Sequence, residues 1–214
     1  MPFIRPALLS LALLAILVPA QANDNAEDTE VRARWSRKYD HHFQKYSKHY
    51  FGLRFDWTWF KAQAIAESRL NPDARSRVGA RGLMQIMPAT FREIRLANPH
   101  FDDIRSPKWN IAAGIYYDRY LYDRWKRYGI PQRLYLTFAS YNAGLGGIRK
   151  ALRKAREPVK SWHQVEPHVP GQTRHYVRRI QHLKSREVAL QALPRGASRL
   201  LAQESAGLKA HQDL

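Results

Sequence analysis

Residues 67–90 read ESRLNPDARSRVGARGLMQIMPAT, and this stretch interrupts a chain that otherwise has helical patterns. The segment before it, residues 57–70, is apolar on nearly every side, which predicts a buried helix. Residues 73–86 lack a helical period and contain Gly79 and Gly82. They therefore predict a loop with a short β-hairpin.

Helices are predicted on both sides of this stretch. Towards the N-terminus, aromatic residues recur every three or four positions, as they do on a packed helix face: Trp35, Tyr39, Phe43, Tyr46 and Tyr50. Towards the C-terminus, the pattern predicts helices at about residues 88–96, from 107 to before 129, and at 132–142, 147–156 and 173–190. In the second of these, Asp118 is expected on the outward face. The fold class is therefore mainly α, in a single domain.

Composition narrows the function classes. The chain has 214 residues, 44% of them hydrophobic and 25% charged, which excludes a disordered protein. It has only one long apolar run, which excludes a multi-span membrane protein. It has no cysteine, so a disulfide framework, a thiolate metal site, a cysteine nucleophile and a lipoprotein cysteine are all excluded. Its net charge of +18 favours an anionic partner.

Residues 1–22 resemble a secretory signal peptide. Arg5 gives a positive start, residues 8–18 are almost wholly apolar, and Ala20-Gln21-Ala22 fits the small-x-small cleavage rule. Cleavage after Ala22 would leave no transmembrane span and a periplasmic or secreted protein. An uncleaved N-terminal anchor is the alternative.

Glu67 is the first candidate for chemistry. It lies in the last turn of the predicted buried helix, where burial and the negative end of the helix dipole both raise the pKa of a carboxyl group. A carboxyl that stays protonated near neutral pH can act as a general acid. The alternative is a solvated surface glutamate.

Four separated blocks carry a family resemblance. They are ESRLNP and its continuation at residues 67–76, VGARGLMQIMPAT at 78–90, SYNAG at 140–144 and TRHYV at 173–177. In this order and spacing the chain resembles the catalytic domain of the soluble lytic transglycosylases, which have a goose-type-lysozyme-like fold. The expected organisation is a signal peptide at 1–22, a lead-in at 23–38, the catalytic domain at 39–190 and a C-terminal tail at 191–214.

The resemblance implies an activity on peptidoglycan. Such enzymes cleave the β-1,4 bond between N-acetylmuramic acid and N-acetylglucosamine and leave a 1,6-anhydro sugar. By resemblance, Glu67 is the single general acid/base. Supporting substrate-binding positions are Ser68, Ser76, Gln85, Met87, Tyr141, Asn142, Gln172 and Tyr176. No cofactor or metal is implied.

Several of these positions have alternative roles. Ser68 could steady Glu67 or cap its helix, and Gln85 could bind sugar or tie down the glycine-containing turn. The resemblance gives Tyr141 a hydroxyl that orients the catalytic carboxyl, whereas Tyr176 could simply pack the last helix. Gln172 replaces a common acidic residue, and Ser140, which precedes Tyr141, replaces a common alanine.

Other functions remain open at this stage. A muramidase-type hydrolase would need a second carboxylate, for which Asp73 and Glu93 are the next acids along the chain. A catalytically silent wall-binding protein is a further alternative. The histidines lack metal-ligand spacing, and the export signal argues against a nucleic-acid partner. The expected partners are peptidoglycan strands, together with envelope assembly or secretion machinery.

Overall fold

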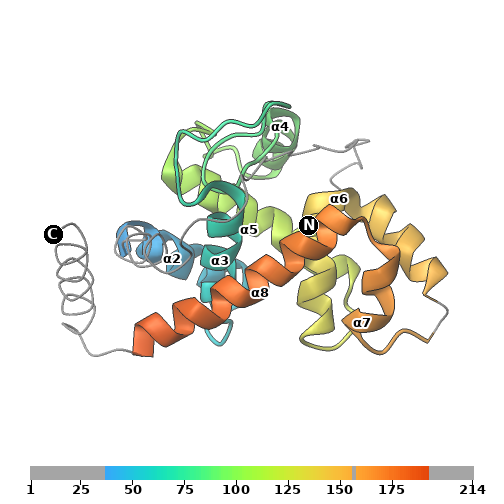
Figure 1. Ribbon diagram of the computed structural model, residues 1–214. Helices are drawn as coiled ribbons and strands as arrows, with labels where there is room; N and C mark the ends of the chain where they lie inside the picture. Colours follow the sequence, from blue (N-terminus) through green and yellow to red (C-terminus); the bar gives the residue numbers. More distant parts are fainter. Residues whose placement is uncertain (1–36, 156–157, 193–214) are drawn as a thin grey trace, which may run out of the picture.

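The computed structural model describes residues 37–155 and 158–192 (Figure 1). Its elements are η1 (Arg37–Tyr39), α2 (Asp40–Phe51), α3 (Thr58–Ser68), α4 (Pro88–Ala97), α5 (Pro107–Arg124), α6 (Gln132–Lys154), α7 (Trp162–Val165), η2 (Glu166–His168) and α8 (Gly171–Ala192). The expected mainly α class is confirmed. The signal peptide, Trp35, most of the lead-in and the C-terminal tail lie outside the described residues. None of the described helices is long and apolar enough to cross a membrane.

Helix α3 lies at the centre of the molecule, and α8 runs across it (Figure 1). Two hydrophobic clusters meet at α3. Ala62 and Ile65 pack into a cluster with residues of α6, α7 and α8. Phe60 and Ala64 pack into another with residues of α2, α4 and α5. The nearly uniform apolar character of α3 is explained by this double packing.

Asp56 binds the first residue of α3. The Asp56 carboxylate accepts hydrogen bonds from the backbone N–H and the hydroxyl of Thr58. The helix ends earlier than expected, because Arg69 and Leu70 adopt left-handed φ angles of 55° and 58°. Glu67 therefore lies one residue from the end of the helix.

The loop after α3 is held against α5. Two isolated antiparallel bridges, Arg75 with Arg81 and Arg81 with Ile86, take the place of the expected hairpin. The Asn110 side chain of α5 donates to the Arg81 carbonyl at 2.9 Å and accepts from the Met84 N–H at 2.7 Å. At Gly82, where φ is 74°, a Cβ would overlap that asparagine amide, so the loop requires glycine.

Two expectations about the later helices have different outcomes. The break near Ala143-Gly144 is confirmed, because Gly144 has non-helical angles (φ 76°, ψ 150°) inside α6. The outward placement of Asp118 is wrong: its side chain is fully buried on α5. Helix α5 is covered by α2 on one side and α6 on another, so part of its polar pattern faces protein. The short α7 and η2 lie between the predicted helices at 147–156 and 173–190, where the sequence predicted no helix.

Candidate active site

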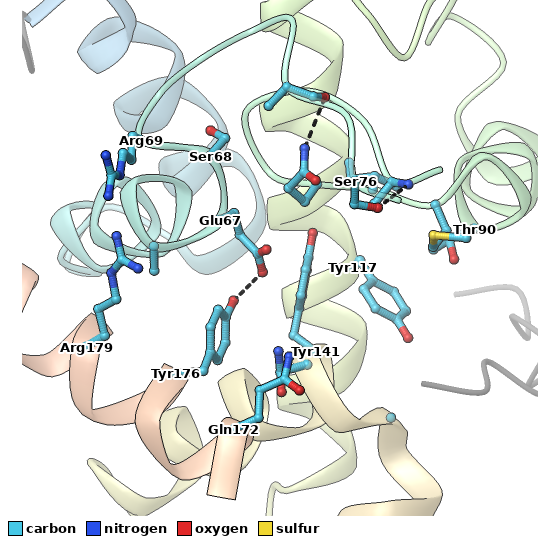
Figure 2. Close-up of a pocket in the computed structure, with 18 of the residues that line it drawn as sticks. Glu67, Ser68, Arg69, Ser76, Thr90, Tyr117, Tyr141, Gln172, Tyr176 and Arg179 are labelled. Atoms are coloured by element: carbon cyan, nitrogen blue, oxygen red, sulfur yellow. Dashed lines mark hydrogen bonds between the residues drawn. The ribbon is translucent and has the colours of Figure 1, made fainter. Parts of the chain in front are cut away.

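A cleft of about 830 Å³ opens where the C-terminal turn of α3, the loop after it, the kink of α6 and the start of α8 meet (Figure 2). All nine site residues named from the sequence line this cleft: Glu67, Ser68, Ser76, Gln85, Met87, Tyr141, Asn142, Gln172 and Tyr176. Residues that lie more than 100 positions apart in the chain are thus brought to one surface. Their individual roles remain predictions.

Glu67 lies at the centre of the cleft. Burial raises the pKa of its carboxyl group from 4.5 to about 7. Two groups act in the opposite direction, a hydrogen bond from Tyr176 and the positive charge of Arg179. Because burial dominates, the carboxyl can hold a proton near neutral pH and can also lose it there. This is the behaviour that a single acid and base requires.

The tyrosine that holds Glu67 is Tyr176. Its hydroxyl donates to Glu67 Oε1 at 2.6 Å, as the dashed line in Figure 2 marks. The hydroxyl of Tyr141, which was expected to orient the carboxyl, donates instead to the Met84 carbonyl at 2.8 Å. Burial raises the pKa of both tyrosines well above 10, so both hydroxyls stay protonated donors. Tyr176 is therefore the tyrosine that contacts the carboxyl, and Tyr141 joins α6 to the loop.

Three predicted residues shape the loop beside Glu67. The Ser68 hydroxyl donates to the Leu83 carbonyl at 2.8 Å, which fastens the end of α3 to the loop. The Gln85 amide donates to the carbonyls of Ala74 and Gly82, so it does tie down the turn, as its alternative role proposed. The buried Ser76 hydroxyl accepts from the backbone N–H four residues later. Each of them sets the shape of the cleft wall.

The remaining predicted residues come from α6, α8 and the start of α4. The Asn142 side chain accepts a hydrogen bond from the Thr173 hydroxyl at 2.9 Å, which joins the kink of α6 to α8. Met87 and Gln172 line the cleft, and Gln172 is exposed. The exposed amide of Gln172 can donate hydrogen bonds to a ligand and accept them from it.

Sequence reasoning missed other lining residues, of which two are arginines beside Glu67. Arg69 and Arg179 lie on one side of Glu67, while Ser76 and Thr90 lie on the other (Figure 2). Burial, and then the nearby charge of Arg69, lower the pKa of Arg179, while the charge of Glu67 acts in the opposite direction. Arg179 follows Tyr176 by three positions on α8, so helical spacing could have identified it.

The acidic groups of the cleft are few. Among the described residues that line it, Glu67 alone has a carboxyl group; Asp73 and Glu93 do not reach it. In the same described part of the chain, no group of three or more histidine and acidic residues could hold a metal ion. The cleft thus combines one half-buried acid with arginines and neutral hydrogen-bonding groups.

Comparisons with known proteins place this cleft in a family context. The model of the transglycosylase SLT domain matches residues 44–163, more than half of the chain. Membrane-bound lytic murein transglycosylase F of Maricaulis maris is 33% identical over 128 residues, which are 58% of this chain and 27% of that protein. The protein of the same name from Shewanella sediminis is 37% identical over 123 residues, 56% of this chain and 23% of that one.

Solved structures of lytic transglycosylases are similar to this chain in fold. The 70 kDa soluble lytic transglycosylase SLT70 of Escherichia coli has a TM-score of 0.63 and 26% identity, covering 76% of this chain and 26% of that one. The likeness confirms the lysozyme-like fold expected from the sequence. The chain spans about a quarter of the length of these relatives.

Proposed function

Because the chain belongs to the transglycosylase SLT domain family, we propose that it is an exported peptidoglycan lytic transglycosylase. It cleaves the β-1,4 bond between N-acetylmuramic acid and N-acetylglucosamine. Its product ends in a 1,6-anhydro-N-acetylmuramic acid. The relatives named lytic murein transglycosylases support the same reaction class.

One observation carries the proposal: among the described residues that line a large cleft, the one carboxyl group is that of the half-buried Glu67, with a pKa raised to about 7. Ordinary glycosidases use two carboxylates about 5–9.5 Å apart. A lining with Glu67 as its one acid, among the described residues, favours a reaction in which the second nucleophile belongs to the substrate.

In the proposed reaction the Glu67 carboxyl group takes part in two proton transfers, first as the donor and then as the acceptor. Glu67 first protonates the leaving glycosidic oxygen, and the N-acetyl group of the substrate meets the charge that develops on the sugar. The Glu67 carboxylate then accepts the proton of the muramoyl 6-hydroxyl as that oxygen closes the ring. Tyr176, 2.6 Å from Glu67 Oε1, keeps the carboxyl oriented through both steps.

The other lining residues position the glycan strand. Gln172 and Asn142 present amides from α8 and α6, and Met87 adds apolar surface at the start of α4. Ser68, Ser76 and Gln85 act indirectly by holding the loop, given the hydrogen bonds that occupy them. Arginines beside Glu67 suit a strand whose stem peptides bear carboxylates.

Export and partners complete the proposal. Residues 1–22 direct the chain to the periplasm or beyond, where peptidoglycan is available. The catalytic domain spans 39–190, and envelope assembly or secretion machinery could recruit it. The excess of positive charge would favour adsorption to the anionic wall.

The decisive experiment is mass spectrometry of the sugars released from purified sacculi by the wild type and by Glu67→Gln. We expect anhydro-ended muropeptides from the wild type and at least about 100-fold less product from the variant, because glutamine cannot donate the proton. Reducing ends, heavier by one water, would instead indicate a muramidase-type hydrolase. Sacculus binding without release would indicate a wall-binding protein.

A further inference from the structure

Another carboxyl group, outside the lining of the cleft, lies in the protein interior. Asp118 of α5 is fully buried, and so is the Gln63 side chain of α3 that contacts it. The Gln63 Nε2 donates to Asp118 Oδ1 at 3.3 Å. Gln63 precedes Glu67 by four positions, which is one turn of the same helix.

One oxygen atom on each side of this contact is unsatisfied within the described part of the chain. Asp118 Oδ2 and Gln63 Oε1 are both buried and have no hydrogen-bond partner among the residues that the structure describes. In an ionised carboxylate and an amide, both atoms are acceptors, so neither can satisfy the other. No ion pair joins Asp118 to a basic side chain in the described part of the chain. An ionised Asp118 would thus be a buried charge without a counter-charge, which is strongly unfavourable.

We propose that Asp118 carries a proton on Oδ2 and donates it to Gln63 Oε1, so that the acid and the amide form a closed pair with two hydrogen bonds. One proton satisfies both leftover atoms at once. The pair fixes the turn of α3 that carries Glu67 against α5 and keeps a second negative charge away from Glu67. Asp118 is then a positioning residue, which rests on the proposed role of Glu67 as the acid/base.

The electrostatic surroundings fit a neutral pair. Burial raises the pKa of Asp118 well above its ordinary value, and the charge of Glu67 raises it further. The titratable groups that share this environment are Glu67 of α3, Tyr117 of α5, Tyr141 of α6 and Tyr176 of α8. The acidic Asp40 of α2, which also packs against α5, pairs with Lys61 instead. An ionised Asp118 would make Glu67 harder to deprotonate, which would oppose its first proton transfer, the donation to the glycosidic oxygen.

The test uses two substitutions and one direct measurement. Asp118→Asn can make the same two hydrogen bonds but carries no titratable proton, so the midpoint of the pH–rate profile should stay at the wild-type value. Asp118→Leu is also neutral but removes both bonds; we expect kcat to fall about tenfold or more with KM changed less than twofold, because Glu67 is mispositioned. Asp123→Asn is the matched control on α5: this aspartate is half-buried and pairs with Arg119 and Arg133, so its carboxyl has the counter-charges that Asp118 lacks.

Infrared spectroscopy of protein labelled with ¹³C at the aspartate carboxyls reads the proton directly. The wild type at pH 7 should show one protonated aspartate band that Asp118→Asn removes and Asp123→Asn retains. Absence of that band overturns the proposal, whatever the activity and whether or not Asp118→Leu folds. A pH–rate midpoint lowered by one unit or more in Asp118→Asn also overturns it, since the native residue would then be charged. Failure of Glu67→Gln to lose activity would refute the proposed function and leave the infrared result decisive for Asp118.

Discussion

Replacing Glu67 by glutamine should make the protein more stable at alkaline pH. The pKa of the folded carboxyl is raised to about 7 from an ordinary value of 4.5. The folded state therefore binds the proton more tightly than the unfolded state does, and stability is lost as the pH rises from 4.5 through 7. At about 1.4 kcal/mol for each tenfold difference in affinity, the loss amounts to about 3 kcal/mol above pH 8. Glutamine avoids this loss and can still accept the hydrogen bond from Tyr176.

Urea unfolding of the wild type and of Glu67→Gln at pH 4.5 and pH 8.5 measures the effect. Comparing the two proteins at each pH cancels the titration of all other groups. We expect a difference below about 1 kcal/mol at pH 4.5 and about 3 kcal/mol in favour of the variant at pH 8.5. An equal difference at both pH values, or no gain at pH 8.5, would show that burial does not strain the ionised carboxyl. The acid role inferred from that burial would then lose its physical basis.

Three further outcomes follow from the site. Tyr176→Phe removes a hydrogen bond that lowers the pKa of Glu67, so the alkaline limb of the pH–rate profile should move to higher pH. The value of kcat should also fall about tenfold, and assays on sacculi over a range of pH measure both effects. Arg179→Gln removes a positive charge that also lowers the pKa of Glu67, so the alkaline limb should again move to higher pH, by a smaller amount. A move to lower pH would contradict the assignment of this limb to Glu67. Gly82→Ala should lower the free energy of unfolding in urea by about 3 kcal/mol or more, because the added Cβ overlaps the side-chain amide of Asn110. Gly79 has a similar φ but open space around it, so Gly79→Ala should lower the free energy of unfolding only by the backbone strain of about 1 kcal/mol.

Much of the site followed from local patterns. The apolar run before Glu67 correctly indicated burial, and burial is the cause of its raised pKa. Gly82 marked a position where α5 approaches the loop too closely for a side chain. The break at Gly144 was visible as glycine at the end of a helical period. In each of these cases the structural reason lies within a few residues of the signal.

What sequence could not settle depends on packing between distant segments. Tyr141 and Tyr176 are both suitable donors, and the choice between them is made by how α6 and α8 meet α3. Asp118 fits the polar pattern of an exposed face, yet α5 is covered at that point by other helices. No local pattern distinguishes an aspartate facing water from one facing Gln63.

The position of α3 in both hydrophobic clusters has a consequence for local opening. Phe60 and Ala64 pack into one cluster, and Ala62 and Ile65 pack into the other. Neither hydrophobic cluster can therefore unfold without exposing a face of this helix to water. The backbone amides in the middle of α3 should therefore exchange with deuterium only when the whole domain unfolds, later than those of α4 at the edge. The helix that carries Glu67 then acts as the cooperative link of the domain, so the acid keeps its surroundings for as long as the protein stays folded.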